Sequence, residues 1–240
     1  MSSNPAIAAT PPPRAQAKRS PLAPVDVARM IMKASAPRAE GGREDIVLAM
    51  AIAMASMTGA RRGELCGLRW DDIDPEACTI RIERQWVAAR GGQHLADPKT
   101  SDGKRTVWLG VEGMAIIERF RGLMAALTDH EPFGWLLSPD ATEGPMGAKS
   151  LAWHIATLAE GLGLKATTHS FRRVAATELV AAGVDVDTAA RRMRHTKEVI
   201  CGSYVLGAAD RQVAAATMVE ARLIEQGLPL AELLPYRKAE

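Results

Sequence analysis

The sequence predicts a mostly helical α+β domain that contains a small antiparallel sheet of about three strands. Apolar residues recur at helical spacing over most of the chain, a short central stretch alternates as a strand does, and helical spacing then returns. The length of 240 residues, with 47% hydrophobic and 24% charged residues, is enough for a substantial core and is unlike a disordered chain.

The first residues, 1–20, are expected to form a flexible basic arm. They are rich in Ala, Pro and Ser and hold too little apolar surface to order themselves. Residues 1–43 carry seven Lys and Arg against two Asp and Glu, a net charge of +5, although the whole chain carries only +2. The net charge of the whole chain therefore does not indicate the kind of partner, whereas the positive charge of residues 1–43 is suited to a negatively charged partner.

Three helices are expected before the sheet. The first spans 24–35, where a proline suits the first turn, and the second spans 44–57, which is apolar nearly all round and therefore buried. Thr58-Gly59 ends the second helix, and a short helix over 61–68 follows.

The sheet is expected in the middle of the chain. Between Cys78 and Val87, isoleucines alternate with charged residues, which is strand spacing. Glycine-containing turns at 91–92 and 101–103 separate this stretch from a last strand at 105–109. Helices then resume, with expected ranges 111–127, 149–161, 168–182, 187–193, 197–204 and 209–226.

Cysteine usage and hydropathy indicate a reduced, cytoplasmic compartment. Cys66, Cys78 and Cys201 are odd in number and widely spaced, which excludes a disulfide framework and a paired-cysteine zinc site. The longest apolar run is far shorter than a membrane span. We therefore expect no cysteine-based metal site and no membrane partner. No other metal and no cofactor are expected either.

The densest polar cluster lies late in the chain. His169 and Arg172 are three residues apart in the first turn of a helix that Thr168 caps, where backbone N–H groups favour an anion. A second basic group follows, formed by Arg191, Arg192, Arg194, His195 and Lys197. Together with the phenol of Tyr204, these guanidinium and imidazole groups suit phosphate chemistry without a metal, and we expect them to form one phosphate-binding face.

An earlier segment completes a family pattern. Residues 58–74 read TGARRGELCGLRWDDID, which resembles the first arginine box of the tyrosine recombinase (phage-type integrase) family, T-G-x-R-x-x-E-L-x-x-L-x-W-x-D-I-D, at every motif position. The family's second box, H-x-x-R, falls on His169 and Arg172. Its third box, a histidine followed nine residues later by the nucleophilic tyrosine, falls on His195 and Tyr204.

The resemblance covers about residues 21–226, which we interpret as the catalytic domain, followed by a tail over 227–240. The family's hairpin lysine matches Lys99. The set of catalytic residues that the resemblance implies is Arg61, Lys99, His169, Arg172, His195 and the nucleophile Tyr204.

The resemblance implies a site-specific DNA recombinase that cleaves and rejoins DNA through a 3′-phosphotyrosine intermediate, without metal or ATP. The two arginines and His195 would stabilise the transition state, and Lys99 would protonate the leaving 5′ oxygen. His169 is the candidate base, because a phenol with a pKa of about 10 is mostly protonated at neutral pH.

The resemblance implies double-stranded DNA as a partner. It also implies a homotetramer, in which four copies of the chain bind two paired DNA sites. An accessory DNA-bending protein is a further possible partner of this assembly. The protein would be associated with DNA in the cytoplasm and encoded by a bacterium or a phage. The family normally places a helical core-binding domain before the catalytic one, and residues 1–20 are too short for it, so we expect a minimal enzyme or a catalytic fragment. Arg173 and Arg194 depart from the family's usual histidine and glycine.

Several candidate residues also have a purely structural interpretation. Arg62 is expected to be solvated charge, and Glu64 to brace a buried arginine rather than react. Lys104 lies close enough to Lys99 to compete for the hairpin role. The acidic residues of 71–74 are interpreted as turn and capping residues rather than a metal site.

Three other functions remain open at this point. A type IB topoisomerase uses the same chemistry to relax one strand, a non-catalytic DNA-binding regulator could derive from an integrase, and a metal-dependent nuclease would be inhibited by chelators.

Overall fold

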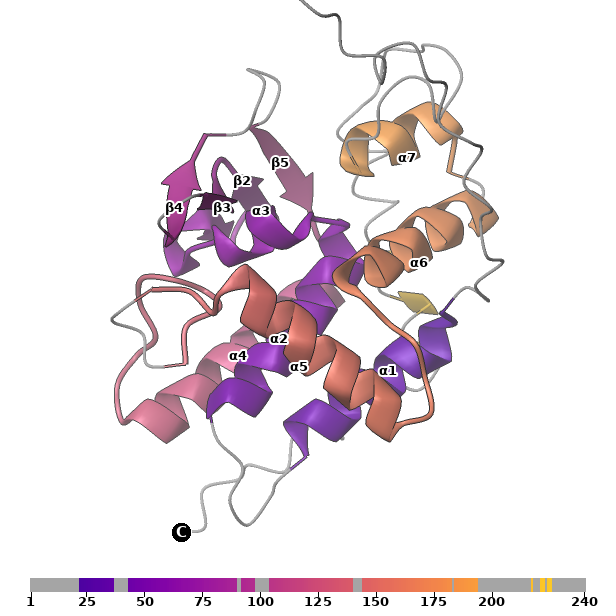
Figure 1. Ribbon diagram of the computed structural model, residues 1–240. Coiled ribbons are helices and arrows are strands. Elements are labelled where there is room, and N and C mark those ends of the chain that lie inside the picture. Colours follow the sequence, from indigo (N-terminus) through magenta and orange to yellow (C-terminus); the bar gives the residue numbers. More distant parts are fainter. Residues whose placement is uncertain are drawn as a thin grey trace, which may run out of the picture.

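The computed structural model describes residues 22–36, 43–89, 92–97, 104–139, 144–182 and 184–193, together with 217, 221–222 and 224–225. The helices are α1 (Pro24–Ser35), α2 (Arg43–Thr58), α3 (Arg62–Cys66), the 3-10 turn η2 (Trp70–Asp72), α4 (Val111–Thr128), α5 (Ala148–Gly161), α6 (Thr168–Ala181) and α7 (Val186–Met193). The strands are β1 (Ile73–Asp74), β2 (Thr79–Ile82), β3 (Gln85–Ala89), β4 (Gly92–Ala96) and β5 (Arg105–Trp108). The predicted class is confirmed, because most of the described elements are helices and the short antiparallel strands lie together at one side of them (Figure 1).

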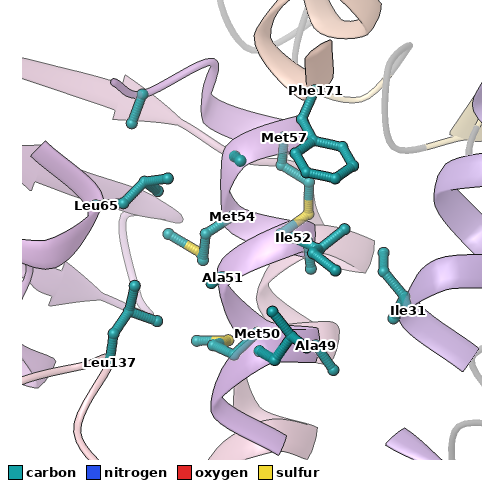
Figure 2. Close-up of a cluster of buried hydrophobic side chains, with 14 of the residues drawn as sticks. Ile31, Ala49, Met50, Ala51, Ile52, Met54, Met57, Leu65, Leu137 and Phe171 are labelled. Atoms are coloured by element: carbon teal, nitrogen blue, oxygen red, sulfur yellow. The ribbon is translucent and has the colours of Figure 1, made fainter. Parts of the chain in front are cut away.

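Helix α2 runs through the centre of the core. Every residue from Val47 to Thr58 is buried, as the all-round apolar sequence predicts. The helix contacts α1, α3, α4, α5 and α6. Figure 2 shows Leu65 and Leu137 on one side of α2 and Ile31 on the other. Each such aliphatic side chain contributes about 1.5–3 kcal/mol when fully buried, so α2 contributes strongly to the stability of the core.

The strands form two sheets rather than one. β1, β2 and β5 make a three-stranded antiparallel sheet, in the order β1-β2-β5, with Ile80 opposite Val107. It contains the predicted last strand and the first half of the predicted strand over 78–87, whereas β1 was not predicted. β3 and β4 form a separate antiparallel hairpin. The predicted strand over 78–87 is therefore two strands, which belong to different sheets.

The break between β2 and β3 is explained by close packing against α3. A Cβ added at Gly67 would lie 2.9 Å from the Arg84 carbonyl oxygen, and one added at Gly63 would lie 2.8 Å from that of Trp86. The two glycines are four residues apart on one face of the helix, so they let the backbone of 84–86 approach α3 directly.

Four of the six helices expected after the sheet are confirmed as α4 to α7, with ends within one residue of the predicted ones. Within the expected helix over 209–226, residues 217, 221–222 and 224–225 are described, and they are helical. The expected arm over 1–20, the helix over 197–204 and the tail over 227–240 lie outside the described residues. Among the helices in the described ranges, none is both long and apolar enough to cross a membrane.

Candidate active site

The first two boxes of the sequence pattern meet in one pocket. The pocket has a volume of about 340 Å³ and lies where α3 and α6 begin. Its lining residues are Ala60, Arg61, Arg62, Thr168, His169 and Arg172. None of these six residues is acidic, and three carry a guanidinium, so the pocket is suited to an anion.

Arg61 is placed by the end of α2. Gly59, at a φ of +64°, turns the chain out of the helix, and the Thr58 hydroxyl accepts a hydrogen bond of 3.1 Å from the Ala60 N–H. Arg61 then adopts an extended conformation as the residue that caps α3. The Glu64 carboxylate accepts its backbone N–H at 2.9 Å and its Nη1 at 3.1 Å. Since the Arg61 side chain is 47% exposed, its guanidinium is held at the pocket surface.

Glu64 braces Arg61, as predicted, and it also binds a second arginine that the sequence did not indicate. Its side chain is 3% exposed, and its Oε2 accepts a hydrogen bond of 2.8 Å from Arg105 on β5. Burial alone would raise the pKa of Glu64, but the hydrogen bond and charge of Arg105, followed by the N–H and charge of Arg61, lower that pKa to about 2. The buried arginine beside Glu64 is thus Arg105 rather than Arg61, and no local sequence pattern indicates it, because Arg105 lies 41 residues from Glu64.

Arg172 reaches the pocket from α6 and is buried, with 3% exposure. Its Nη1 donates to the carbonyl of Gly59 and its Nη2 donates to the carbonyl of Met193. These bonds fix the guanidinium between the end of α2 and the end of α7. The residue therefore belongs to the pocket, and its orientation depends on both neighbouring segments.

His169 is exposed at the pocket, in the first turn of α6. Partial burial and then the positive charges of Arg172, Arg173 and Arg61 lower its pKa below the ordinary value. Both effects favour the neutral imidazole, which is the form that can accept a proton.

One expectation about arginines holds and another is corrected. Arg62 is exposed in the first turn of α3, as expected of solvated charge, and it also lines the pocket. Arg192 is not part of a phosphate-binding face, because it is 3% exposed and its Nη1 and Nη2 donate to the carbonyls of Trp108 and Met57 at 2.7 and 2.9 Å. Buried carbonyl groups at these positions attract the guanidinium inward.

The acidic residues after α3 act in turns, as interpreted from the sequence. Asp72 accepts the Arg69 N–H at 2.8 Å and pairs with Arg84 at 2.5 Å. Asp74 accepts the Ala77 N–H at 2.9 Å.

The other three predicted site residues, Lys99, His195 and Tyr204, lie outside the described residues and stay predictions. Lys104, the alternative to Lys99, is exposed and lies 3.8 Å from the Asp97 carboxylate.

Comparison with known proteins supports the sequence pattern. A family model described as the phage integrase family matches residues 23–209. Among solved structures, the Tn1549 transposon integrase in complex with a circular intermediate DNA matches with a TM-score of 0.62 and 19% identity, covering 83% of this chain and 66% of that chain. The chain thus spans about two thirds of that integrase.

Two further structures have the same fold. The integrase from mycobacterium phage Brujita matches with a TM-score of 0.58 and 20% identity, over 93% of this chain and 68% of that one. The XerA recombinase matches with a TM-score of 0.50 and 20% identity, over 85% of this chain and 64% of that one. No curated protein sequence matches the chain.

Proposed function

Because the chain belongs to the phage integrase family, we propose that it is a site-specific DNA recombinase that cleaves and rejoins DNA through a phosphotyrosine link at Tyr204. The observation that carries this proposal is the pocket in which Arg61, His169 and Arg172 meet, with Glu64 bracing the first of them. The DNA-bound Tn1549 integrase has the same fold, which supports double-stranded DNA as the substrate.

In the proposed cleavage step, the phenol oxygen of Tyr204 forms a bond to phosphorus while the bond from phosphorus to the 5′ oxygen breaks. The phenol proton passes to neutral His169, and Lys99 gives a proton to the leaving 5′ oxygen. Extra negative charge on the non-bridging oxygens is stabilised by the guanidinium groups of Arg61 and Arg172, with His195 as a further donor.

Fixed cations are well suited to this task. Glu64 and the carbonyls of Gly59 and Met193 hold the two guanidinium groups before the substrate arrives, so little reorganisation is needed as charge develops. The covalent link conserves the energy of the phosphodiester, so that a 5′ hydroxyl of another end can reverse the step without ATP. Exchange between duplexes would require four protomers on two sites, and an accessory DNA-bending protein would assist that assembly.

The test is a trapping assay with DNA of a candidate site that carries a nick next to the scissile phosphate. Loss of the short fragment prevents rejoining, so a covalent protein–DNA adduct accumulates. We expect Tyr204→Phe to abolish the adduct, because the change removes the nucleophilic oxygen and keeps the ring. Proteolysis of the trapped complex should give a nucleotide on the peptide that contains Tyr204.

Tyr236→Phe is the matched control and should form the adduct at the normal rate, since the chain contains only two tyrosines. A chelator should leave the yield unchanged. An adduct on Tyr236, or full cleavage by Tyr204→Phe, would contradict the proposal. Loss of activity with chelator would favour a metal-dependent nuclease, and relaxation of supercoiled DNA without exchange between two sites would favour a topoisomerase.

A further inference from the structure

Helix α7 is joined to two other elements by one buried side chain. Arg192 donates through Nη1 to the carbonyl of Trp108, at the end of β5, and through Nη2 to the carbonyl of Met57, in the last turn of α2. Figure 1 shows α7 lying over α6, with which it is in contact. The guanidinium therefore connects α7, α2 and β5 at one point.

The neighbouring residue continues this connection to the pocket. The carbonyl of Met193 accepts the hydrogen bond from Arg172 Nη2, and the Met193 thioether lies against Gly59, where an added Cβ would collide with it. The carbonyl of Gly59 accepts the bond from Arg172 Nη1. One acceptor of Arg172, Gly59, thus lies two residues after a carbonyl that Arg192 binds, and the other, Met193, is the next residue after Arg192.

The chemistry of these groups explains why arginine is suited to this position. The last four carbonyls of a helix have no partner within the helix, and they form the negative end of its dipole, so a cation stabilises the end of α2. A planar guanidinium can donate to two carbonyls that face it from different elements, whereas a lysine offers a single point of charge. Arg192 accordingly bonds α7 to the last turn of α2 and to the end of β5.

We propose that Arg192 is a positioning residue, which holds the carbonyls of Gly59 and Met193 at the spacing that orients Arg172 in the pocket. This inference rests on the proposed function only where it predicts an effect on the rate of DNA cleavage. Its other prediction, that Arg192 fixes the orientation of the Arg172 guanidinium, can be measured without DNA.

The catalytic arm of the test compares Arg192→Met and Arg192→Lys with the wild type. We expect adduct formation at saturating DNA to slow about 100-fold for the methionine variant, because displacement of a positioned group by about 1 Å costs a factor of this size. The dissociation constant for DNA should change no more than about twofold. Arg121→Met is the control for loss of an arginine, since Arg121 lies on α4 and pairs with Glu131 away from the pocket.

A double-variant cycle separates positioning from general loss of stability. If Arg192 acts through Arg172, Arg172→Lys with Arg192→Met should cleave no more slowly than Arg172→Lys alone. If the two substitutions reduced the cleavage rate by factors that multiply in the double variant, the proposal would be overturned, since Arg192 would then act independently of Arg172.

The second arm observes the Arg172 guanidinium directly by ¹⁵N–¹H NMR, with its signals assigned by their loss in Arg172→Lys. We expect narrow, exchange-protected guanidinium signals in the wild type, and broadening in Arg192→Met while the backbone amide spectrum stays dispersed. Arg192→Lys replaces the methionine variant if that one does not fold. Unchanged Arg172 signals in a folded variant would overturn the positioning role. A wild type that forms no adduct, together with Arg172 signals that respond to the change, would overturn the proposed function alone.

Discussion

At the scale of the residue, the pocket depends on a carboxylate that does not line it. Glu64 receives hydrogen bonds from Arg61 on its own helix and from Arg105 on β5, and it is almost fully buried. Loss of the only partner of a buried carboxylate costs about 3–5 kcal/mol, whereas Glu64 has two arginine partners that share its negative charge. The exposed guanidinium of Arg61 and the buried guanidinium of Arg105 therefore depend on the same group.

This dependence predicts the acid stability of the protein. The pKa of Glu64 in the folded state is about 2, below its ordinary value of 4.5, so its ionised form stabilises the fold above pH 4.5 and that contribution is lost as the pH falls towards 2. Arg105→Gln removes the strongest of the interactions that lower this pKa, and burial then raises it. We expect the midpoint of acid unfolding, followed by tryptophan fluorescence, to move to higher pH.

The control for this prediction is Arg121→Gln, which breaks an exposed pair with Glu131 and should leave the acid midpoint where it is. If Arg105→Gln unfolded at the same pH as the wild type, the role of Arg105 in stabilising ionised Glu64 would be wrong.

At the scale of the element, α3 connects the sheet to the pocket, and its two glycines make that connection possible. The helix places Glu64 and Leu65 in the core on one side, while Gly63 and Gly67 face the backbone of β3 on the other. Because no side chain separates the helix from the strand, β3 packs directly against the helix that Arg61 caps.

We expect Gly63→Ala to destabilise the protein by about 1–3 kcal/mol, because the new methyl group would meet a backbone carbonyl that cannot move aside. Gly122→Ala on α4 provides the matched comparison, since nothing lies within 4 Å of the added Cβ. That change should stabilise the protein by about 0.4–1 kcal/mol, through helix propensity and the unfolded state. Urea unfolding measures both, and an equal effect of the two substitutions would contradict the packing argument.

The same element shows which features can be predicted from sequence. Helix ends are recovered within one residue where apolar spacing is regular and a proline or a glycine marks the boundary, as for α1 and α4. The division of 78–87 into two strands is decided by contact with Gly63 and Gly67, which local periodicity does not record.

The residues of the candidate site likewise include some that the sequence predicts and some that it does not. Arg61, His169 and Arg172 were indicated by motif spacing, and the structure brings them together. The roles of Arg105 and Arg192 follow from acceptors 41 and 135 residues away in the chain, so no local pattern indicates them.

At the scale of the whole molecule, charge is distributed unevenly around a nearly neutral total. The described pocket holds three arginines, while residues 1–20 supply three further cations, Arg14, Lys18 and Arg19. Cations that neutralise DNA phosphates release counterions, and each such contact adds about 0.9 to the slope of log affinity against log salt. Affinity from this segment should therefore be independent of DNA sequence and sensitive to salt.

Deletion of residues 1–20 is expected to reduce that slope by up to about three units, with little effect on discrimination between DNA sequences. The measurement is DNA binding by anisotropy over a series of salt concentrations, in a Tyr204→Phe background so that no covalent adduct contributes. Replacement of the three cations by glutamine at constant chain length should reduce the salt slope by the same amount as the deletion, because the slope depends on charge rather than on length. A slope that is the same in the deletion variant and the full chain would show that these residues make no contact with DNA phosphates, and the basic pocket would then account for the electrostatic part of binding.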